Sequence, residues 1–346
     1  MLLLKPSHSR LLGAALLALG VSSCQSNSRQ ETGAAPAKPG VSLLKLERTV
    51  PLPNVKGGFD LMALDAAGQR LFVAAEDNHT VEVIDVRHGR ALASLPGFNE
   101  PKWVVYRPEG NRVFVSTGGD GRVTELDGTT YRPVRSYAFR EACNNLRYDS
   151  LARQLVVGVG KTFGALGLID VARNVQAGEI PLAGYAKQFE LDGRRIYVNE
   201  PALNQVEVID RDTHKPVATW PVTGSSQNIP MALDRVHHRL FVACAPGRLV
   251  VFATADGRQV ASLPLPADAD SIYYDSARQR LYISCGAGSI AVVQQSTPDA
   301  YQTRQLLPTV PGAGTSLFAA GLNQYFLATP QAGNQPAGLR IYRPAP

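Results

Sequence analysis

Short apolar runs recur along most of the chain, each one directly behind an arginine or a glutamine. The first apolar residue of each run stands at 71, 113, 155, 196, 240, 281 and 325, so the spacing is 41 to 44 residues. A loop and a second run of β-forming residues, often ending in Asp, follow. Repeats of this period with four short strands each are typical of propellers. The pattern therefore predicts an all-β fold, a seven-bladed β-propeller over residues 42–346.

The first unit illustrates the strands that the pattern predicts, which are 59–64, 71–75, 81–86 and 91–95. The second strand of each unit is apolar throughout, as expected where a sheet packs between two neighbours. The last unit stops after the strand at 337–342, whereas 43–53 precedes the first unit and resembles a fourth strand. We expect this N-terminal strand to close the last blade, because an open ring would expose unpaired sheet edges.

The turn between the first and second strands carries an acidic residue and, five positions on, a basic one, as in Asp65 and Arg70. Because the pair recurs in most units, it favours a structural role over a catalytic one. We expect exposed pairs worth less than about 1 kcal/mol each. His237 and His238 fall in one such turn and are predicted to be solvated.

The N-terminus is typical of an exported protein. Residues 1–23 combine a short basic start, an apolar run and small residues, which predicts a signal peptide. The ending before Cys24 resembles the bacterial lipobox, which implies lipidation of Cys24; an ordinary signal peptide with Cys24 as a bystander is the alternative. Residues 24–41 are then the lipidated cysteine and a flexible tether.

These features predict a location at the bacterial cell envelope. The chain would be lipid-anchored at the periplasmic face, with the membrane as one partner. Gln25, where a retained lipoprotein carries Asp, favours the outer membrane.

Composition and charge exclude several classes of protein. The chain is 45% hydrophobic and 18% charged, with 31 Gly and 24 Pro, which excludes a disordered tail or a coiled coil. The formal net charge is +6, but no Lys/Arg cluster stands anywhere, so we expect no nucleic-acid partner. The three cysteines after Cys24 are odd in number, which argues against a disulfide framework, and no haem-attachment motif is present. We expect Cys244 and Cys285 to be unpaired, half-buried thiols, and the protein to be a monomer.

The repeats also resemble a known family. The segment Arg195-IYVNE and its equivalents are similar to the YVTN-type (YncE-like) repeat of bacterial β-propellers. The phrases Asn145-LRYD, Asn228-IPMALD and Tyr282-ISCG resemble an exported lipoprotein branch of that family, over roughly residues 42–343. The resemblance implies a propeller fold and implies no particular reaction.

Candidate binding residues follow from the repeat register. In a propeller the first strand of each blade lines the central channel, and it begins eleven residues before each apolar run. Those positions are Asp60, Lys102, Asn144, Tyr185, Ile229, Asp270 and Gly314. Nearby polar candidates are Asn145, Lys187, Gln188, Asn228 and Asp268. This ring predicts a small-ligand site at the channel mouth, although polar residues there could serve only to hydrate a wide channel.

Three classes of function are compatible with such a mouth. The first is a binding scaffold for a small ligand or an envelope protein, which we favour. The alternative is a metal-dependent hydrolase resembling gluconolactonase-type propellers, with Asp60, Asn144 and Asp270 offering oxygen ligands to Ca²⁺ or Mg²⁺. The third is a redox subunit, against which the missing haem motif argues. Catalytic residues cannot be assigned from the sequence, and we favour binding over an enzyme.

Overall fold

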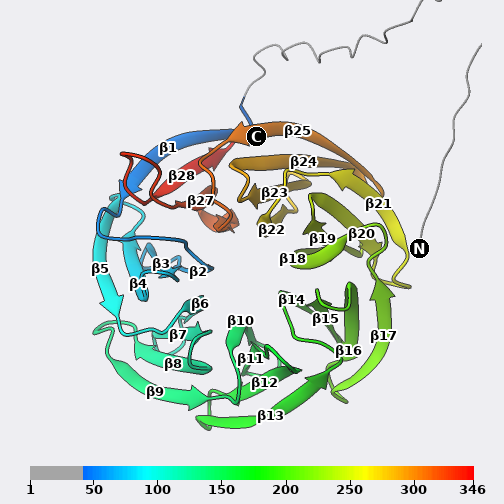
Figure 1. Cartoon of the computed structure of the whole chain (residues 1–346), viewed down its shortest axis with the longest axis horizontal. Coiled ribbons are helices and arrows are strands. Elements are labelled where there is room, and N and C mark those ends of the chain that lie inside the picture. The colour runs from blue at the N-terminus through cyan, green and yellow to red at the C-terminus, as the bar shows by residue number, and fades with distance from the viewer. Residues whose placement is uncertain (1–41) are drawn as a thin grey trace, which may run out of the picture. The chain divides into compact units, whose positions relative to one another are not determined.

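Seven four-stranded antiparallel sheets form a ring around a central axis (Figure 1). The computed structural model describes residues 42–346. Within that range the regular elements are 28 strands and one short 3₁₀ helix, η1 (Ala320–Leu322). The predicted all-β, seven-bladed propeller is confirmed. None of its elements is a helix long and apolar enough to cross a bilayer.

The blades follow one another along the chain, with the first strand of each innermost and the fourth outermost. Blade 1 comprises β2 (Met62–Asp65), β3 (Arg70–Ala75), β4 (Thr80–Asp85) and β5 (Arg90–Pro96). Blade 2 comprises β6 (Pro101–Arg107), β7 (Arg112–Thr117), β8 (Arg122–Asp127) and β9 (Pro133–Ala138). Blade 3 comprises β10 (Cys143–Asp149), β11 (Gln154–Val159), β12 (Gly164–Asp170) and β13 (Val175–Leu182). Blade 4 comprises β14 (Phe189–Asp192), β15 (Arg195–Glu200), β16 (Gln205–Asp210) and β17 (Lys215–Pro221).

The remaining blades keep the same order. Blade 5 comprises β18 (Ser226–Asp234), β19 (Arg239–Ala245), β20 (Arg248–Ala253) and β21 (Gln259–Pro264). Blade 6 comprises β22 (Ala269–Asp275), β23 (Arg280–Cys285), β24 (Ser289–Thr297) and β25 (Ala300–Pro308). Blade 7 comprises β26 (Ser316–Ala319), β27 (Gln324–Thr329), β28 (Gly338–Pro344) and β1 (Leu44–Pro51).

Burial explains the apolar second strands. All five residues Leu71–Ala75 of β3 are buried, because blades 7 and 2 cover the two faces of that sheet. The outer strands differ: β25 alternates exposed and half-buried residues along its whole length, as one face meets solvent. The core is therefore a set of apolar layers between adjacent blades rather than one central cluster.

The ring closes through the N-terminal strand, as predicted. β1 pairs antiparallel with β28 from Leu44 opposite Pro344 to Pro51 opposite Gly338. Leu44 and Val50 are buried at this seam, and Glu47 forms an ion pair with Arg343. In Figure 1 the blue β1 lies directly outside the red β28.

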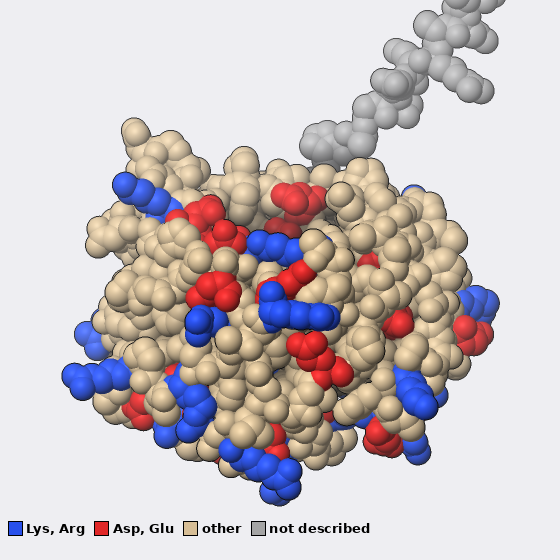
Figure 2. Space-filling view, turned by 60° about the horizontal axis from the view of Figure 1, so that its bottom comes forward, with Lys and Arg blue, Asp and Glu red and all other residues tan. Residues whose placement is uncertain are grey.

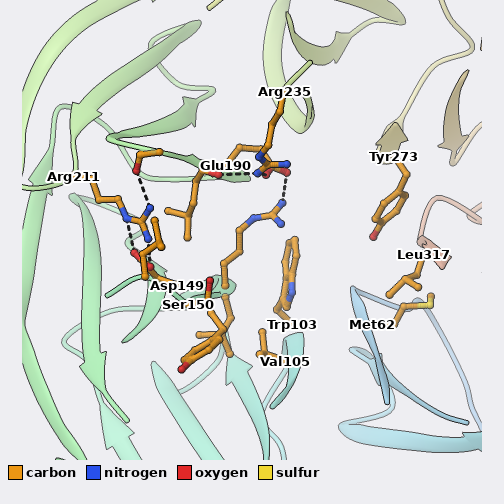
Figure 3. A pocket seen from close by; sticks show the side chains of 16 residues that line it. Met62, Trp103, Val105, Asp149, Ser150, Glu190, Arg211, Arg235, Tyr273 and Leu317 are labelled. Carbon is orange, nitrogen blue, oxygen red and sulfur yellow. Dashed lines mark hydrogen bonds and ion pairs between the residues drawn. The ribbon is translucent and has the colours of Figure 1, made fainter. Parts of the chain in front are cut away.

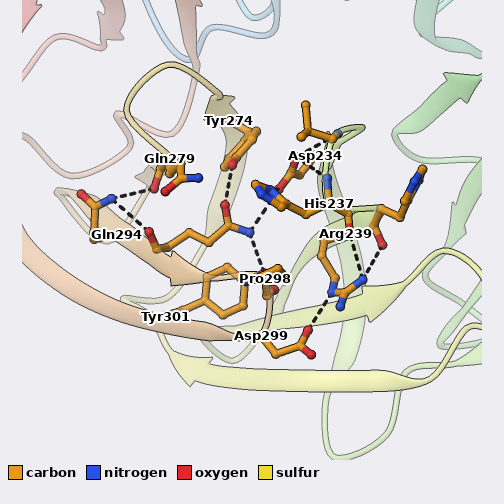
Figure 4. Close-up of polar contacts among 12 residues, drawn as sticks. Asp234, His237, Arg239, Tyr274, Gln279, Gln294, Pro298, Asp299 and Tyr301 are labelled. Atoms are coloured by element: carbon orange, nitrogen blue, oxygen red, sulfur yellow. Dashed lines mark hydrogen bonds and ion pairs between the residues drawn. The ribbon is translucent and has the colours of Figure 1, made fainter.

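In four blades the acidic residue of the first turn is buried: Asp65, Asp149, Asp234 and Asp275. The value of less than about 1 kcal/mol expected for an exposed pair therefore does not apply to these turns. Asp65 is 3% exposed; it accepts a hydrogen bond from the Gly68 backbone (2.9 Å) and pairs with Arg70 at 2.7 Å. Burial and backbone capping recur at Asp234, whose side-chain partner is the half-buried His237 at 2.7 Å (Figure 4). His237 is therefore not simply solvated. These carboxylates hold the turn in shape by accepting backbone hydrogen bonds.

The three cysteines in the described range are free and buried. The prediction that Cys244 and Cys285 are unpaired is confirmed, but they are buried rather than half-buried. Cys244 and Cys285 occupy equivalent positions at the ends of β19 and β23, inside the layers between blades. Burial raises the pKa of both thiols to about 12. They behave as small apolar side chains.

Candidate functional site at the channel mouth

One cavity of about 240 Å³ lies at the start of the inner strands and collects most of the predicted ring. Asp60, Lys102, Asn144 and Asp270 all line it, and so do the neighbouring candidates Asn145, Lys187 and Gln188. These residues come from the inner segments of blades 1 to 4 and of blade 6. Residues at the same offset before their apolar runs therefore lie at about the same height along the channel axis.

Irregular strand pairing turns several of these side chains toward the channel. The pairing of β6 with β7 shifts register between Pro101 and Trp103, so that Lys102 lies at the irregularity. The pairing of β22 with β23 shifts register in the same way between Ala269 and Ser271, so that Asp270 also lies at an irregularity. A β-bulge re-aims a side chain out of the normal alternation, which accounts for charged residues at the head of otherwise apolar strands.

Blade 4 departs from the predicted register. Its first turn has only two residues between the paired Asp192 and Arg195, where blade 1 has four between Asp65 and Arg70. Counting eleven residues back therefore selects Tyr185, but the equivalent of Asp60 is Lys187. Lys187 lines the cavity and Tyr185 does not. The expectation for Tyr185 was wrong.

The mouth brings half-buried acidic and basic side chains together. Burial, reinforced by Glu76, raises the pKa of Asp60 to about 7, against the opposing effect of Lys102 and Lys187. Burial and the nearby Asp268 raise the pKa of Asp270 to about 6. Both carboxylates are therefore desolvated groups whose charge is only partly compensated.

The lysines at the mouth are not equivalent. Lys102 forms an ion pair with Glu76, which also lines the cavity. Lys187 makes no ion pair within residues 42–346 and lowers the pKa of both aspartates from a distance. Once the Lys102–Glu76 pair is set aside, two carboxylates face one lysine.

The other predicted residues serve the framework or the rim. Gln188 is buried and donates to the Asp270 carbonyl (3.0 Å), linking blades 4 and 6 across the channel. Asn228 is fully buried, lies outside the cavity lining, and donates to Asn199 at 2.8 Å. Asp268 is exposed at the edge and does not line the cavity.

Glu76 was missed by the sequence reasoning. It is the first residue after the apolar run of β3, where the other units carry Gly, Pro or Ala. That contrast is the signal that could have identified it, because a lone charge at a repeated loop position indicates a local role.

The described residues contain no set of side chains arranged to coordinate the predicted metal ion. Between residues 42 and 346 no group of three or more His, Cys, Asp or Glu side chains is arranged to hold a metal ion. Asp60, Asn144 and Asp270 share the cavity with two lysines that already supply positive charge. A Ca²⁺ or Mg²⁺ site there stays a prediction.

Fold and mouth together define the class: a seven-bladed β-propeller with a polar channel opening. Over 98 residues the chain is 30% identical to the uncharacterized protein YncE of Salmonella typhi and 29% identical to YncE of Salmonella typhimurium. Each match spans 28% of this chain and 28% of the relative. The seven blades and this similarity confirm the expected resemblance to YncE-like propellers, while the lipoprotein branch stays a prediction. No family model matches the chain.

Solved structures support the fold. A chain of a mitotic checkpoint complex superimposes with a TM-score of 0.73 at 16% identity, covering 96% of this chain and 99% of that one. A chain of the hydrazine synthase of Kuenenia stuttgartiensis gives 0.73 at 17% identity, covering 84% and 97%. At such identities the likeness describes architecture alone.

Proposed function

We propose that the protein is a lipid-anchored binding protein of the bacterial cell envelope, whose channel mouth binds a small organic cation. The observation that carries the proposal is the unequal charge in the mouth, where three carboxylates, those of Asp60, Asp270 and Glu76, share two lysines and Lys102 is already paired with Glu76. A protonated amine would compensate the remaining carboxylate. The small volume of the cavity favours a group the size of an alkylammonium over a large substrate.

The energetic reason lies in desolvation. A partly buried carboxylate loses hydration, and hydrogen-bond donors, a cation or a proton can compensate that loss. Asp60 accepts one hydrogen bond, from the Leu61 backbone at 2.9 Å. The raised pKa values of Asp60 and Asp270, about 7 and about 6, mean that a proton fills this role only when the pH falls below these values. A bound ammonium would take it over and form charge-assisted hydrogen bonds.

Putrescine, a small aliphatic diamine, is the probe for this proposal. We expect it to raise the melting temperature of the full-length protein at pH 8, where the carboxylates are ionised, through preferential binding to the folded state. The double variant Asp60→Asn/Asp270→Asn should lose that gain, because it keeps the shape of the mouth and removes its charge.

The matched control is Asp212→Asn/Asp256→Asn, which removes two exposed carboxylates from outer turns. It should keep the full response to putrescine. Equal stabilisation of the mouth variant and the native protein would refute the proposal. Stabilisation by Ca²⁺ but not by putrescine would replace the organic cation with a metal ion.

A further inference from the structure

A second and larger cavity, of about 530 Å³, lies on the channel farther along the inner strands (Figure 3). Each inner strand contributes a second residue to the channel, three positions after its residue at the mouth. This second residue pairs with the second apolar residue of the next strand, as Arg147 pairs with Val156 and Tyr273 with Tyr282. Six of these positions line this cavity or the one beside it: Val105, Arg147, Glu190, Ala232, Tyr273 and Leu317. This layer therefore has a charged side in blades 3 and 4 and a largely apolar remainder.

The charged side has spare donors but no spare acceptor. Arg147 donates through Nη2 to Glu190 Oε1 at 2.8 Å, and Arg235 lies 3.8 Å from the other oxygen of that carboxylate. Glu190 thus already faces two guanidinium groups. The Nε of Arg147, in contrast, is buried without a hydrogen-bond partner in residues 42–346. A guanidinium has five N–H donors, so Arg147 retains donors for an incoming acceptor.

An aromatic surface adjoins this guanidinium. Arg147 lies 5.4 Å from the ring centre of Trp103, which also lines the cavity. Figure 3 shows Trp103 next to Val105, with Tyr273, Leu317 and Met62 on the facing side of the channel. Arg211 does not compete for an anion, because its Nε donates to Asp149 (2.6 Å) and its Nη1 to the Gly193 carbonyl.

We infer that this cavity binds a small carboxylate with an aromatic or apolar body. The carboxylate would accept hydrogen bonds from Arg147, because bidentate contact with a planar carboxylate is the interaction that a guanidinium forms best. The body would lie against Trp103 and the apolar wall. The volume falls within the range of small-molecule sites in proteins. The site is distinct from the mouth, and its ligand carries the opposite charge.

Trp103 provides the readout for the test. The chain has two tryptophans, and the other, Trp220, packs against Tyr197 and Phe252 outside the channel. A Trp220→Phe background in the full-length protein keeps an aromatic ring there and leaves Trp103 as the reporter. Phenylacetate should change its emission in a saturable way. Phenylacetamide, which lacks the charge, and acetate, which lacks the ring, should each bind at least tenfold more weakly.

Two variants link the signal to the site. Arg147→Gln should weaken phenylacetate binding at least tenfold, and Val105→Phe should do the same by filling the cavity without changing its charge. The matched control Arg304→Gln, on the exposed side of β25, should bind normally. The mouth variant Asp60→Asn/Asp270→Asn should also bind normally. Because Val105→Phe keeps every polar contact, it retains the test if Arg147→Gln fails to fold.

Three results would overturn the inference. One is the absence of a saturable response to phenylacetate. Another is native affinity in Arg147→Gln or in Val105→Phe. The third is equal binding of phenylacetamide or of acetate, which would indicate a purely apolar site or a simple anion site.

Discussion

Asp60 and Asp270 oppose folding when they ionise, because both give up hydration at the mouth. Their pKa values, about 7 and about 6, are above the ordinary 3.8 of an aspartate. A raised pKa means that the folded state holds the proton more tightly than the unfolded chain. The resulting stability is fully present below about pH 4 and is lost as the pH rises through 6 and 7.

This linkage predicts a pH profile for stability. Between pH 5 and pH 8 the native protein should lose stability more steeply than Asp60→Asn/Asp270→Asn, which has no proton to release at these positions. Urea midpoints measured across that range would show it. A double variant with the same slope as the native protein would mean that the two carboxylates are solvated in the folded state.

Residue positions in the mouth could be predicted wherever the repeat keeps its length. The eleven-residue offset located Asp60, Lys102 and Asp270 because each of those blades has the same first turn. The offset failed for Lys187, because the first turn of blade 4 is two residues shorter and the offset from the apolar run is therefore nine residues instead of eleven. The pattern of apolar strands does not reveal this shortening. Ion pairing between different repeats, as for Lys102 with Glu76, follows no period and has to be seen in three dimensions.

At the scale of elements, neighbouring blades are joined by buried polar contacts as well as by apolar layers. Gln295 of β24 is 1% exposed and donates to Asp234 of blade 5 (3.1 Å) and to the Tyr301 hydroxyl (3.2 Å). It also accepts a hydrogen bond from Tyr274. One amide therefore satisfies groups from two sheets.

Removing this amide should be costly. Gln295→Met keeps the volume but leaves the Tyr274 hydroxyl and one oxygen of Asp234 with fewer partners, so we expect a loss of about 1–3 kcal/mol. Chemical denaturation would measure it. Gln302→Met on the exposed β25 is the control and should stay within about 0.5 kcal/mol of the native protein. A loss at Gln295 no larger than the control would mean that these contacts are exchanged for water without penalty.

The closing strand is the element on which the last blade depends. Deleting residues 42–53 removes β1 and exposes the edge of β28. The truncated protein should melt at a lower temperature and self-associate, since exposed strand edges pair with one another. Calorimetry and light scattering would test this, and a monomeric protein with an unchanged melting temperature would contradict it.

At the scale of the whole molecule, charge is spread rather than concentrated. Figure 2 shows Lys and Arg interspersed with Asp and Glu over the visible face, with no continuous area of one sign. The fold at this scale could be predicted from the sequence almost completely, because a propeller repeats one pattern of four strands. The last unit lacks a fourth strand, and residues 43–53 have the pattern of such a strand. The ligand could not be predicted, since it depends on how different repeats meet at the axis.

The proposed membrane anchor is tested independently of the propeller. Cys24 lies outside the described residues, so the prediction rests on the lipobox-like sequence. Cys24→Ser removes the thiol that would accept the lipid. The variant should leave the membrane fraction or accumulate as a precursor, with no incorporation of labelled fatty acid. Labelling equal to that of the native protein would refute the anchor.

The pairing of β1 with β28 also imposes an order on folding. Leu44 and Pro344 meet in one sheet although almost the whole domain separates them in sequence, so the closing step has to wait until the last strand has been synthesised. Contacts between distant segments slow folding, because the entropy of a long loop is lost before the contact forms.

A circular permutant that starts at residue 54 and carries 42–53 after Pro346 would convert this step into a local hairpin. We expect it to refold faster than the native order of strands while unfolding at a similar rate, which stopped-flow fluorescence would resolve. Equal refolding rates would place the slow step in the blades themselves. If the permutant refolds faster, the refolding rate of this propeller depends on the position of the closing strand β1 in the sequence.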